Sequence, residues 1–255
     1  LTDLKTEIVY TDKDFVGFQI FSYGDVLYIT CQTTVELLKY SISTGEATKL
    51  FYEGKEIAEY YCAVKSEEKL YLIPHTATAD CAICYNMEKN EFSVDSRLRD
   101  RLQEMGGIEN EQVLYPVEYY NTLWGAIACT KYFFSFQLQT GEFCLYQTEH
   151  SDSLYSLGCD GKKVYITQKS SPDIIIKSLE GDDTVRYVHT QNQSGDMLYS
   201  CVLEFDRYQA VLSRYGKQVV FIDKRTMETK ECVLYPENES RVGASNTIIC
   251  VENET

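Results

Sequence analysis

Short runs of apolar residues alternate with polar turn residues along nearly the whole chain. Turn-forming residues, such as those at 23–25 and 160–162, come shortly before several of the runs. Short apolar runs bounded by turn residues predict β-strands, each joined by a tight hairpin to the strand before it. The runs are Val26–Ile29, Leu70–Ile73, Leu123–Ile127, Val164–Ile166, Ala210–Leu212 and, near the C-terminus, Thr247–Val251.

A repeated phrase marks a further hairpin in each unit. It occurs as Tyr40-Ser-Ile-Ser-Thr-Gly-Glu46, Tyr85-Asn-Met-Glu-Lys-Asn-Glu91 and Phe136-Gln-Leu-Gln-Thr-Gly-Glu142, with weaker copies at 176–182 and 221–228, the last one residue longer. A Thr-Gly or Lys-Asn pair between apolar strand ends is typical of a hairpin turn. The phrases start 40 to 51 residues apart, and this period is typical of β-propeller blades.

An aromatic residue opens the first predicted strand of each unit: Phe18, Tyr61, Tyr115, Tyr155 and Tyr199. Three landmarks in a fixed order predict one all-β domain over 1–255, a β-propeller of six four-stranded blades. The predicted blades cover about 15–57, 58–110, 111–151, 152–196, 197–240, and finally 241–255 together with 1–12. The termini share the last blade because an open ring would expose two strand edges. A five-bladed ring with loose tails and a seven-bladed ring missing upstream sequence are the alternatives.

One segment departs from the strand pattern. Leu98, Leu102 and Met105 recur at helical spacing near 96–105, and Gly106 follows as a stop signal. We therefore expect a short surface helix between the second and third blades. It is either a structural addition or a docking element for a partner.

The net charge narrows the range of partners. The 255 residues carry a formal net charge of −15, whereas proteins that bind nucleic acids usually present a basic stripe. The chain also has no run of 18 apolar residues of the kind that spans a membrane. We expect no nucleic-acid partner and no membrane insertion.

Cysteine usage bears on the cellular compartment. Most of the ten cysteines lie within or beside apolar strands, where they act as small buried side chains. This pattern favours a reducing cytoplasm, and a removed signal peptide would instead indicate the cell surface or export. The chain begins at Leu1 without Met, so we expect a processed or partial chain that can belong to a longer polypeptide.

Candidate ligand-binding residues cluster on loops expected at one mouth of the central channel. The loops between second and third strands carry basic and aromatic side chains, namely His75, Lys131, Tyr132, Lys169, Arg214 and Tyr215. Arg214 is best suited to a bidentate contact with a carboxylate or phosphate. The tyrosines Tyr61, Tyr115, Tyr155 and Tyr199 are expected near the same mouth, where they either contact a sugar or peptide or pack between blades.

Motifs for catalysis and metal binding are sparse. The three histidines fall in separate blades, outside any HxH or HExxH arrangement, and the chain lacks the GxSxG, Walker A and GxGxxG motifs. Cys81 and Cys84 lack a second pair of zinc ligands. We expect no cofactor, no metal and no catalytic residue.

These observations favour a non-enzymatic binding or scaffold propeller that recognises a protein, peptide or carbohydrate at the channel mouth. A propeller hydrolase or lyase acting on a glycan or peptide is the alternative, because 39 acidic residues leave paired-carboxylate chemistry open. A purely structural module of a larger surface protein is a third possibility.

One blade carries a family resemblance. Lys69–Pro74, followed by Ala82–Tyr85 and Lys89–Phe92, resembles the blade phrase of uncharacterised bacterial propeller proteins with six or seven blades. The Trp-Asp dipeptide of WD40 blades is absent, and Gly106-Gly107 is the only pair resembling those of kelch blades. The resemblance implies the fold and a bacterial source, and it supplies no activity or catalytic residue.

Overall fold

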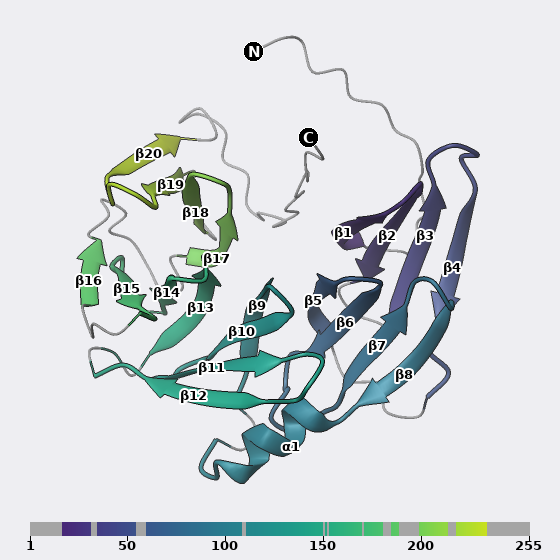
Figure 1. The fold of residues 1–255 in the computed structure, drawn as a ribbon, viewed down its shortest axis with the longest axis horizontal. Helices are drawn as coiled ribbons and strands as arrows, with labels where there is room; N and C mark the ends of the chain where they lie inside the picture. The colour runs from purple at the N-terminus through teal and green to yellow at the C-terminus, as the bar shows by residue number, and fades with distance from the viewer. Residues whose placement is uncertain are drawn as a thin grey trace.

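The computed structural model of the protein describes residues 17–31, 35–54, 60–108, 111–149, 151, 153–169, 171–180, 185–188, 199–213 and 218–233. These residues form five four-stranded antiparallel sheets, each with its strands in chain order. Figure 1 shows the sheets following one another around a common centre, with β1, β5, β9, β13 and β17 innermost. The predicted all-β propeller with four-stranded blades is confirmed, and the predicted sixth blade lies outside the described residues.

The strands of the first three sheets are β1 (Gly17–Tyr23), β2 (Val26–Cys31), β3 (Glu36–Ser41), β4 (Ala47–Phe51), β5 (Tyr60–Ser66), β6 (Lys69–Pro74), β7 (Ala82–Asn86), β8 (Glu91–Asp95), β9 (Val113–Tyr119), β10 (Thr122–Ile127), β11 (Tyr132–Gln137) and β12 (Phe143–Gln147). Those of the last two are β13 (Leu154–Cys159), β14 (Lys163–Gln168), β15 (Ile174–Ser178), β16 (Val185–Val188), β17 (Tyr199–Glu204), β18 (Tyr208–Ser213), β19 (Gln218–Asp223) and β20 (Thr229–Val233). The apolar runs predicted as second strands are β2, β6, β10, β14 and β18.

The repeated phrase forms the turn between the third and fourth strands of its sheet. One residue in each of four copies adopts a left-handed conformation, namely Gly45, Asn90, Gly141 and Met227, with φ between 55° and 76°. Glycine and asparagine tolerate this region, whereas most side chains are strained in it. The Thr-Gly and Lys-Asn pairs therefore recur because the turn needs a left-handed residue at this point.

The structure corrects the length of the last copy. In the first turn the Ser41 N–H donates to the Glu46 carbonyl at 2.9 Å, and in the last turn the Asp223 N–H donates to the Glu228 carbonyl at 2.9 Å. Both bonds close turns of equal length. The last copy is therefore no longer than the others.

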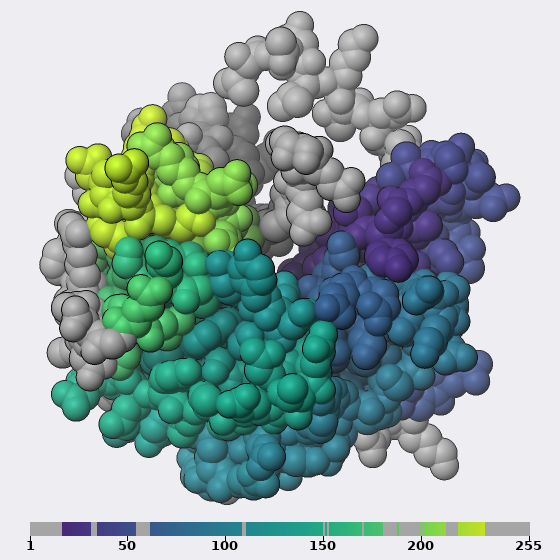
Figure 2. Space-filling view, in the orientation of Figure 1, coloured from purple at the N-terminus to yellow at the C-terminus, as the bar shows by residue number. Residues whose placement is uncertain are grey.

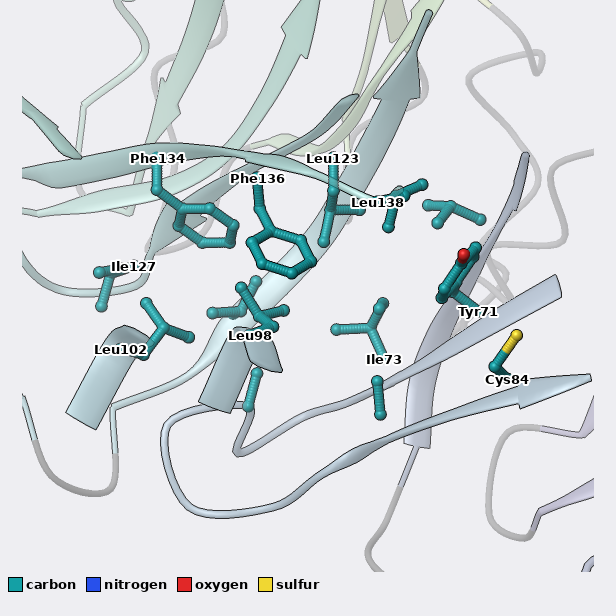
Figure 3. Packing of buried hydrophobic residues seen from close by; sticks show 14 of the residues in the cluster. Tyr71, Ile73, Cys84, Leu98, Leu102, Leu123, Ile127, Phe134, Phe136 and Leu138 are labelled. Carbon is teal, nitrogen blue, oxygen red and sulfur yellow. The ribbon is translucent and has the colours of Figure 1, made fainter. Parts of the chain in front are cut away.

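The apolar core lies between neighbouring sheets. Each strand alternates its side chains between the sheet's two faces, so a blade contributes to the interface on either side of it. One large cluster joins the second and third sheets and includes Tyr71, Ile73, Leu123, Phe134 and Phe136 (Figure 3). Further clusters join the first sheet to the second, the third to the fourth and the fourth to the fifth.

The predicted short helix is present as α1 (Arg97–Glu104). Its Leu98 and Leu102 are 3% and 0% exposed and pack in the cluster between the second and third sheets (Figure 3). Gly106 follows with φ +63°, consistent with a helix stop. No helix in the described ranges is long and apolar enough to cross a membrane.

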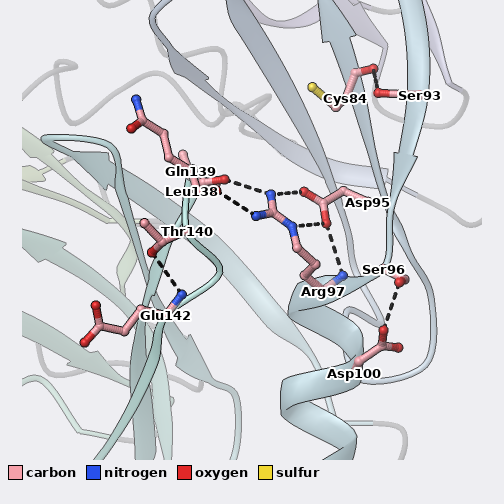
Figure 4. Close-up of polar contacts among 10 residues, drawn as sticks. All are labelled: Cys84, Ser93, Asp95, Ser96, Arg97, Asp100, Leu138, Gln139, Thr140 and Glu142. Atoms are coloured by element: carbon pink, nitrogen blue, oxygen red, sulfur yellow. Dashed lines mark hydrogen bonds and ion pairs between the residues drawn. The ribbon is translucent and has the colours of Figure 1, made fainter.

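Arg97 ties α1 to the third sheet (Figure 4). Its guanidinium donates to both carboxylate oxygens of Asp95 at 2.9 and 2.6 Å, and to the backbone carbonyls of Leu138 and Gln139 at 2.7 and 3.1 Å. Leu138 and Gln139 belong to the turn between β11 and β12. One side chain thus links the end of the second sheet to the third.

Replacing Arg97 by alanine is expected to lower the free energy of unfolding by about 1–2 kcal/mol. Hydrogen bonds to charged groups contribute about 1.5–3 kcal/mol in buried settings, and the Arg97 side chain is 42% exposed, which reduces that contribution. Arg101→Ala on the same helix is the matched control, with an expected loss below about 0.5 kcal/mol, because its partner Glu104 is 64% exposed. Equal losses for both variants in urea denaturation would contradict the role given to Arg97.

Candidate functional site: a central cavity

The five innermost strands line a cavity of about 350 Å³. Figure 2 shows the hollow at the centre of the ring of sheets. Its walls are residues 18–22 from β1, 63–65 from β5, 115–118 from β9, 158–159 from β13, and 201–205 from β17 and its following turn. Because each wall belongs to a different blade, packing between the sheets fixes the shape of the cavity.

One strand position lines the cavity in all five sheets. In each sheet, the last pair of residues before the turn joins the first strand to the second, as Tyr23 and Val26 do in the first sheet. The position in question lies on the first strand, one residue before that last pair. The residues at this position are Ser22, Lys65, Glu118, Cys159 and Glu204, named here the cavity ring. The ring thus combines a hydroxyl, an ammonium, a thiol and two carboxyl groups within otherwise largely apolar strands.

Two carboxyl groups of the cavity ring are held by neighbouring donors. Glu118 Oε1 accepts a hydrogen bond from the Asn121 backbone N–H at 2.6 Å, and Glu204 Oε1 pairs with Lys224 Nζ at 3.0 Å. Burial raises the pKa of the Glu204 carboxyl, and the bond from Lys224 opposes that rise. Both side chains are therefore oriented before any ligand binds.

Cys159 is a poor nucleophile. It is 2% exposed, and burial raises the pKa of its thiol to about 12, although the Gly161 backbone N–H partly stabilises the thiolate. The reactive form of cysteine is the thiolate, and a thiol with this pKa is protonated near neutral pH. The ring cysteine thus serves as a wall of the cavity.

Exposed aromatic residues border the same end of the propeller. Tyr23, Tyr120 and Phe205 are 36%, 80% and 50% exposed. They lie at the hairpins between the first and second strands of the first, third and fifth sheets. Of the three, Phe205 lines the cavity, whereas Tyr23 and Tyr120 belong to other hairpins at the same end.

The structure divides the predicted aromatic collar. Phe18 and Tyr115 line the cavity, and Tyr115 lies 6.2 Å from Tyr155, between ring centroids. Tyr155 and Tyr199 are 2% and 0% exposed and pack within the core. Tyr61 belongs to β5, and its side chain lies outside the described part of the chain.

The predicted basic loops lie at the opposite end from the cavity ring, because the second strand of each sheet runs antiparallel to the first. Lys131 is exposed, with its Nζ 5.6 Å from the centroid of the Tyr132 ring. Lys169 Nζ lies 3.6 Å from Cys129 Sγ of the neighbouring blade. His75 lies between β6 and β7, and its carbonyl accepts a hydrogen bond from Val113 N–H at 3.1 Å.

Two further predicted residues, Arg214 and Tyr215, lie outside the described residues. Within the described ranges, no group of three or more His, Cys, Asp or Glu side chains is arranged to hold a metal ion. The loop end therefore shows basic side chains from neighbouring blades, and the cavity ring lies towards the hairpin end.

The cavity ring was not among the residues predicted from the sequence. Its signal is nevertheless present in the printed chain, at the first position of the segments Ser-Tyr-Gly-Asp (22–25), Lys-Ser-Glu-Glu (65–68), Glu-Tyr-Tyr-Asn (118–121), Cys-Asp-Gly-Lys (159–162) and Glu-Phe-Asp-Arg (204–207). These segments share one register when the hairpins between first and second strands are superimposed, and the ring residues then occupy a single position.

Comparisons with known proteins identify the fold. No protein-family model matches the chain, and no curated protein matches it in sequence. Similar solved structures include a streptogramin B lyase (TM-score 0.65, 12% identity, covering 87% of this chain and 70% of the other). A second similar structure is a catalytically inactive virginiamycin B lyase from Staphylococcus aureus with quinupristin. Its TM-score is 0.65 and its identity 14%, and the match covers 89% of this chain and 73% of the other. A nidogen/laminin complex has a TM-score of 0.62 and 10% identity, and the match covers 85% of this chain and 80% of the other. Sequence identities this low support the propeller fold alone.

Proposed function

We propose that this protein is a non-enzymatic binding propeller that holds a peptide segment of a partner protein at the central cavity. The cavity ring carries this proposal, because five equivalent positions from five blades line one cavity. Ligand sites combine apolar walls with a few well-placed polar groups and usually measure about 300–1,000 Å³. A cavity of about 350 Å³ suits one or two side chains of a bound segment.

The lining favours binding over catalysis. The described lining residues include no histidine, and the Cys159 thiol is protonated near neutral pH because its pKa is raised to about 12. A hydrolase or lyase is the second candidate, supported by two carboxyl groups, Glu118 and Glu204, that line the same cavity. Paired carboxyl groups can act as general acid and base.

The proposal also has an alternative surface and an alternative ligand. The alternative surface is the face at which the sequence predicts ligand binding, formed by the basic loops with His75, Lys131, Tyr132, Lys169, Arg214 and Tyr215. Carbohydrate is the alternative ligand. We also keep as part of the proposal that the protein is of bacterial origin, because its second blade resembles those of bacterial propellers.

Blocking the cavity tests the proposed function. Ser22 is an exposed member of the ring, and the indole of Ser22→Trp would occupy part of the cavity. Peptides selected from a random phage-displayed library are expected to lose affinity about tenfold or more for this variant, measured by fluorescence anisotropy. The variant Lys131→Ala/Lys169→Ala, at the opposite end, is expected to leave the affinity unchanged.

If Lys131→Ala/Lys169→Ala lost affinity and Ser22→Trp kept it, the basic loops and not the cavity would be the binding face. Failure of the selection to enrich any peptide, with glycan binding detected on an array, would replace the peptide by a carbohydrate. Circular dichroism of both variants checks that the fold is retained.

A further inference from the structure

The hairpin end of the propeller is strongly acidic. In each sheet four residues run from the cavity ring to the end of the first hairpin, at 22–25, 65–68, 118–121, 159–162 and 204–207. These five segments contain seven carboxyl groups and three basic groups. One of the basic groups, Arg207, already donates to Asp223 Oδ2 at 2.6 Å.

The ring carboxyl group of Glu204 can accept a further donor. Its Oε1 accepts from Lys224 Nζ at 3.0 Å, and an ionised carboxylate has about four lone-pair sites. Burial raises the pKa of the Glu204 carboxyl even though its side chain is 36% exposed, so Lys224 offsets only part of the cost of the charged form. A cation placed beside it would recover part of that cost.

Aromatic side chains follow the ring residues in three of the segments. Phe205 directly follows Glu204 and lines the cavity, and Tyr23 directly follows Ser22. In the third segment Tyr119 follows Glu118, and its ring lies 4.6 Å from that of the exposed Tyr120, between centroids. A lysine or arginine side chain is attracted to the face of an aromatic ring as well as to a carboxylate. Such a combination suits an alkyl chain that ends in a positive charge.

From this juxtaposition we infer that the bound segment is a basic peptide, with a lysine or arginine side chain inserted into the cavity that Glu118 and Glu204 of the cavity ring help to line. The inference rests on the function proposed above and names its ligand class. Its partner is a protein segment with clustered positive charge. The net charge of −15 speeds the approach of such a segment by long-range attraction.

The basic loops at the other end make the two faces chemically distinct. Lys131 and Lys169 lie there beside carboxyl groups such as Asp80, Asp173 and Glu149, so the loop end offers a basic segment a surface of mixed charge. Lys65 is the only basic member of the cavity ring. Removing its charge should therefore strengthen binding, which reverses the effect expected for the ring carboxyl groups.

Three labelled peptides of equal length test the inference. They are acetylated and amidated, and they carry three central lysines, three glutamates or three glutamines in the same glycine-serine sequence. Fluorescence anisotropy at low salt is expected to show binding of the lysine peptide alone. Glu118→Gln and Glu204→Gln are each expected to weaken it about tenfold, and Lys65→Gln to strengthen it about threefold.

Glu149→Gln is the matched control. Glu149 is exposed and follows β12 at the loop end, so this variant removes one negative charge far from the cavity and should leave the affinity within about twofold. Equal weakening by Glu149→Gln and the ring variants would overturn the inference, because binding would then follow net charge alone. The glutamine carbonyl of Glu118→Gln keeps an acceptor for Asn121, and thermal melts check that each variant is folded.

Two failures can be distinguished. If the glutamate or glutamine peptide binds and Ser22→Trp abolishes that binding, the cavity is a peptide site and the inferred charge is wrong. If the lysine peptide binds equally well to Ser22→Trp, its binding bypasses the cavity and the basic-peptide inference fails. If, in addition, the selected phage peptides ignore Ser22→Trp, the proposed function fails with it.

Discussion

Replacing Phe134 by alanine is expected to lower the free energy of unfolding by about 3–5 kcal/mol. Phe134 is fully buried in the cluster between the second and third sheets (Figure 3). Its ring stacks 5.7 Å from the Phe143 ring, between centroids, and covers Gly125 of the neighbouring strand. The truncated side chain would leave a cavity that two rigid sheets cannot close, and such cavities carry a cost beyond the lost apolar surface.

Leu145→Ala is the control for this prediction. Leu145 pairs with Phe134 across β11 and β12 but is 41% exposed, so its truncation should cost less than about 1 kcal/mol. Urea denaturation measures both variants. A loss below 1 kcal/mol for Phe134→Ala would show that the interface between the sheets can rearrange around the missing ring.

Gly158→Ala is expected to destabilise the protein by about 1–3 kcal/mol, because the added methyl group overpacks a tight interface. A Cβ at Gly158 would lie 2.5 Å from Val202 Cγ1 and 2.8 Å from Val202 Cβ. Val202 is 1% exposed and branched at Cβ, which leaves it few alternative rotamers. The fourth and fifth sheets must therefore separate slightly, next to the wall of the cavity.

A double mutant isolates this contact. Val202→Ala removes the atoms that the new methyl group meets, so Gly158→Ala/Val202→Ala should be more stable than the sum of the two single losses predicts, by about 1 kcal/mol or more. Additive losses in the same denaturation assay would mean that the backbone at Gly158, and not the contact with Val202, determines the cost.

Local signals account for the success of the fold prediction. The turn between third and fourth strands requires a left-handed residue, so Gly45, Asn90 and Gly141 left a mark that repeats with the blade period. The second strands have two buried faces and therefore appear as continuous apolar runs. The helix was visible because Leu98 and Leu102 keep helical spacing within a strand-rich chain.

The candidate site was harder to locate. The sequence predicts a site at the loop end, where Lys131 and Lys169 lie, together with aromatic residues at the start of each first strand. Two of these, Tyr155 and Tyr199, are buried between blades. An aromatic residue in a strand has the same appearance in a sequence whether it packs against a neighbouring sheet or faces a channel.

The sequence by itself determined the class of fold, the four-stranded repeat and the position of the helix, because each depends on contacts or turn geometry within one blade. Only the tertiary structure decided that Ser22, Glu118 and Glu204 share a cavity, since they are separated by up to 182 positions. An irregular register near the start of each first strand also shifts which residue lines the channel. The residues of the cavity ring come together because five sheets pack around one centre. A local sequence pattern cannot bring them together.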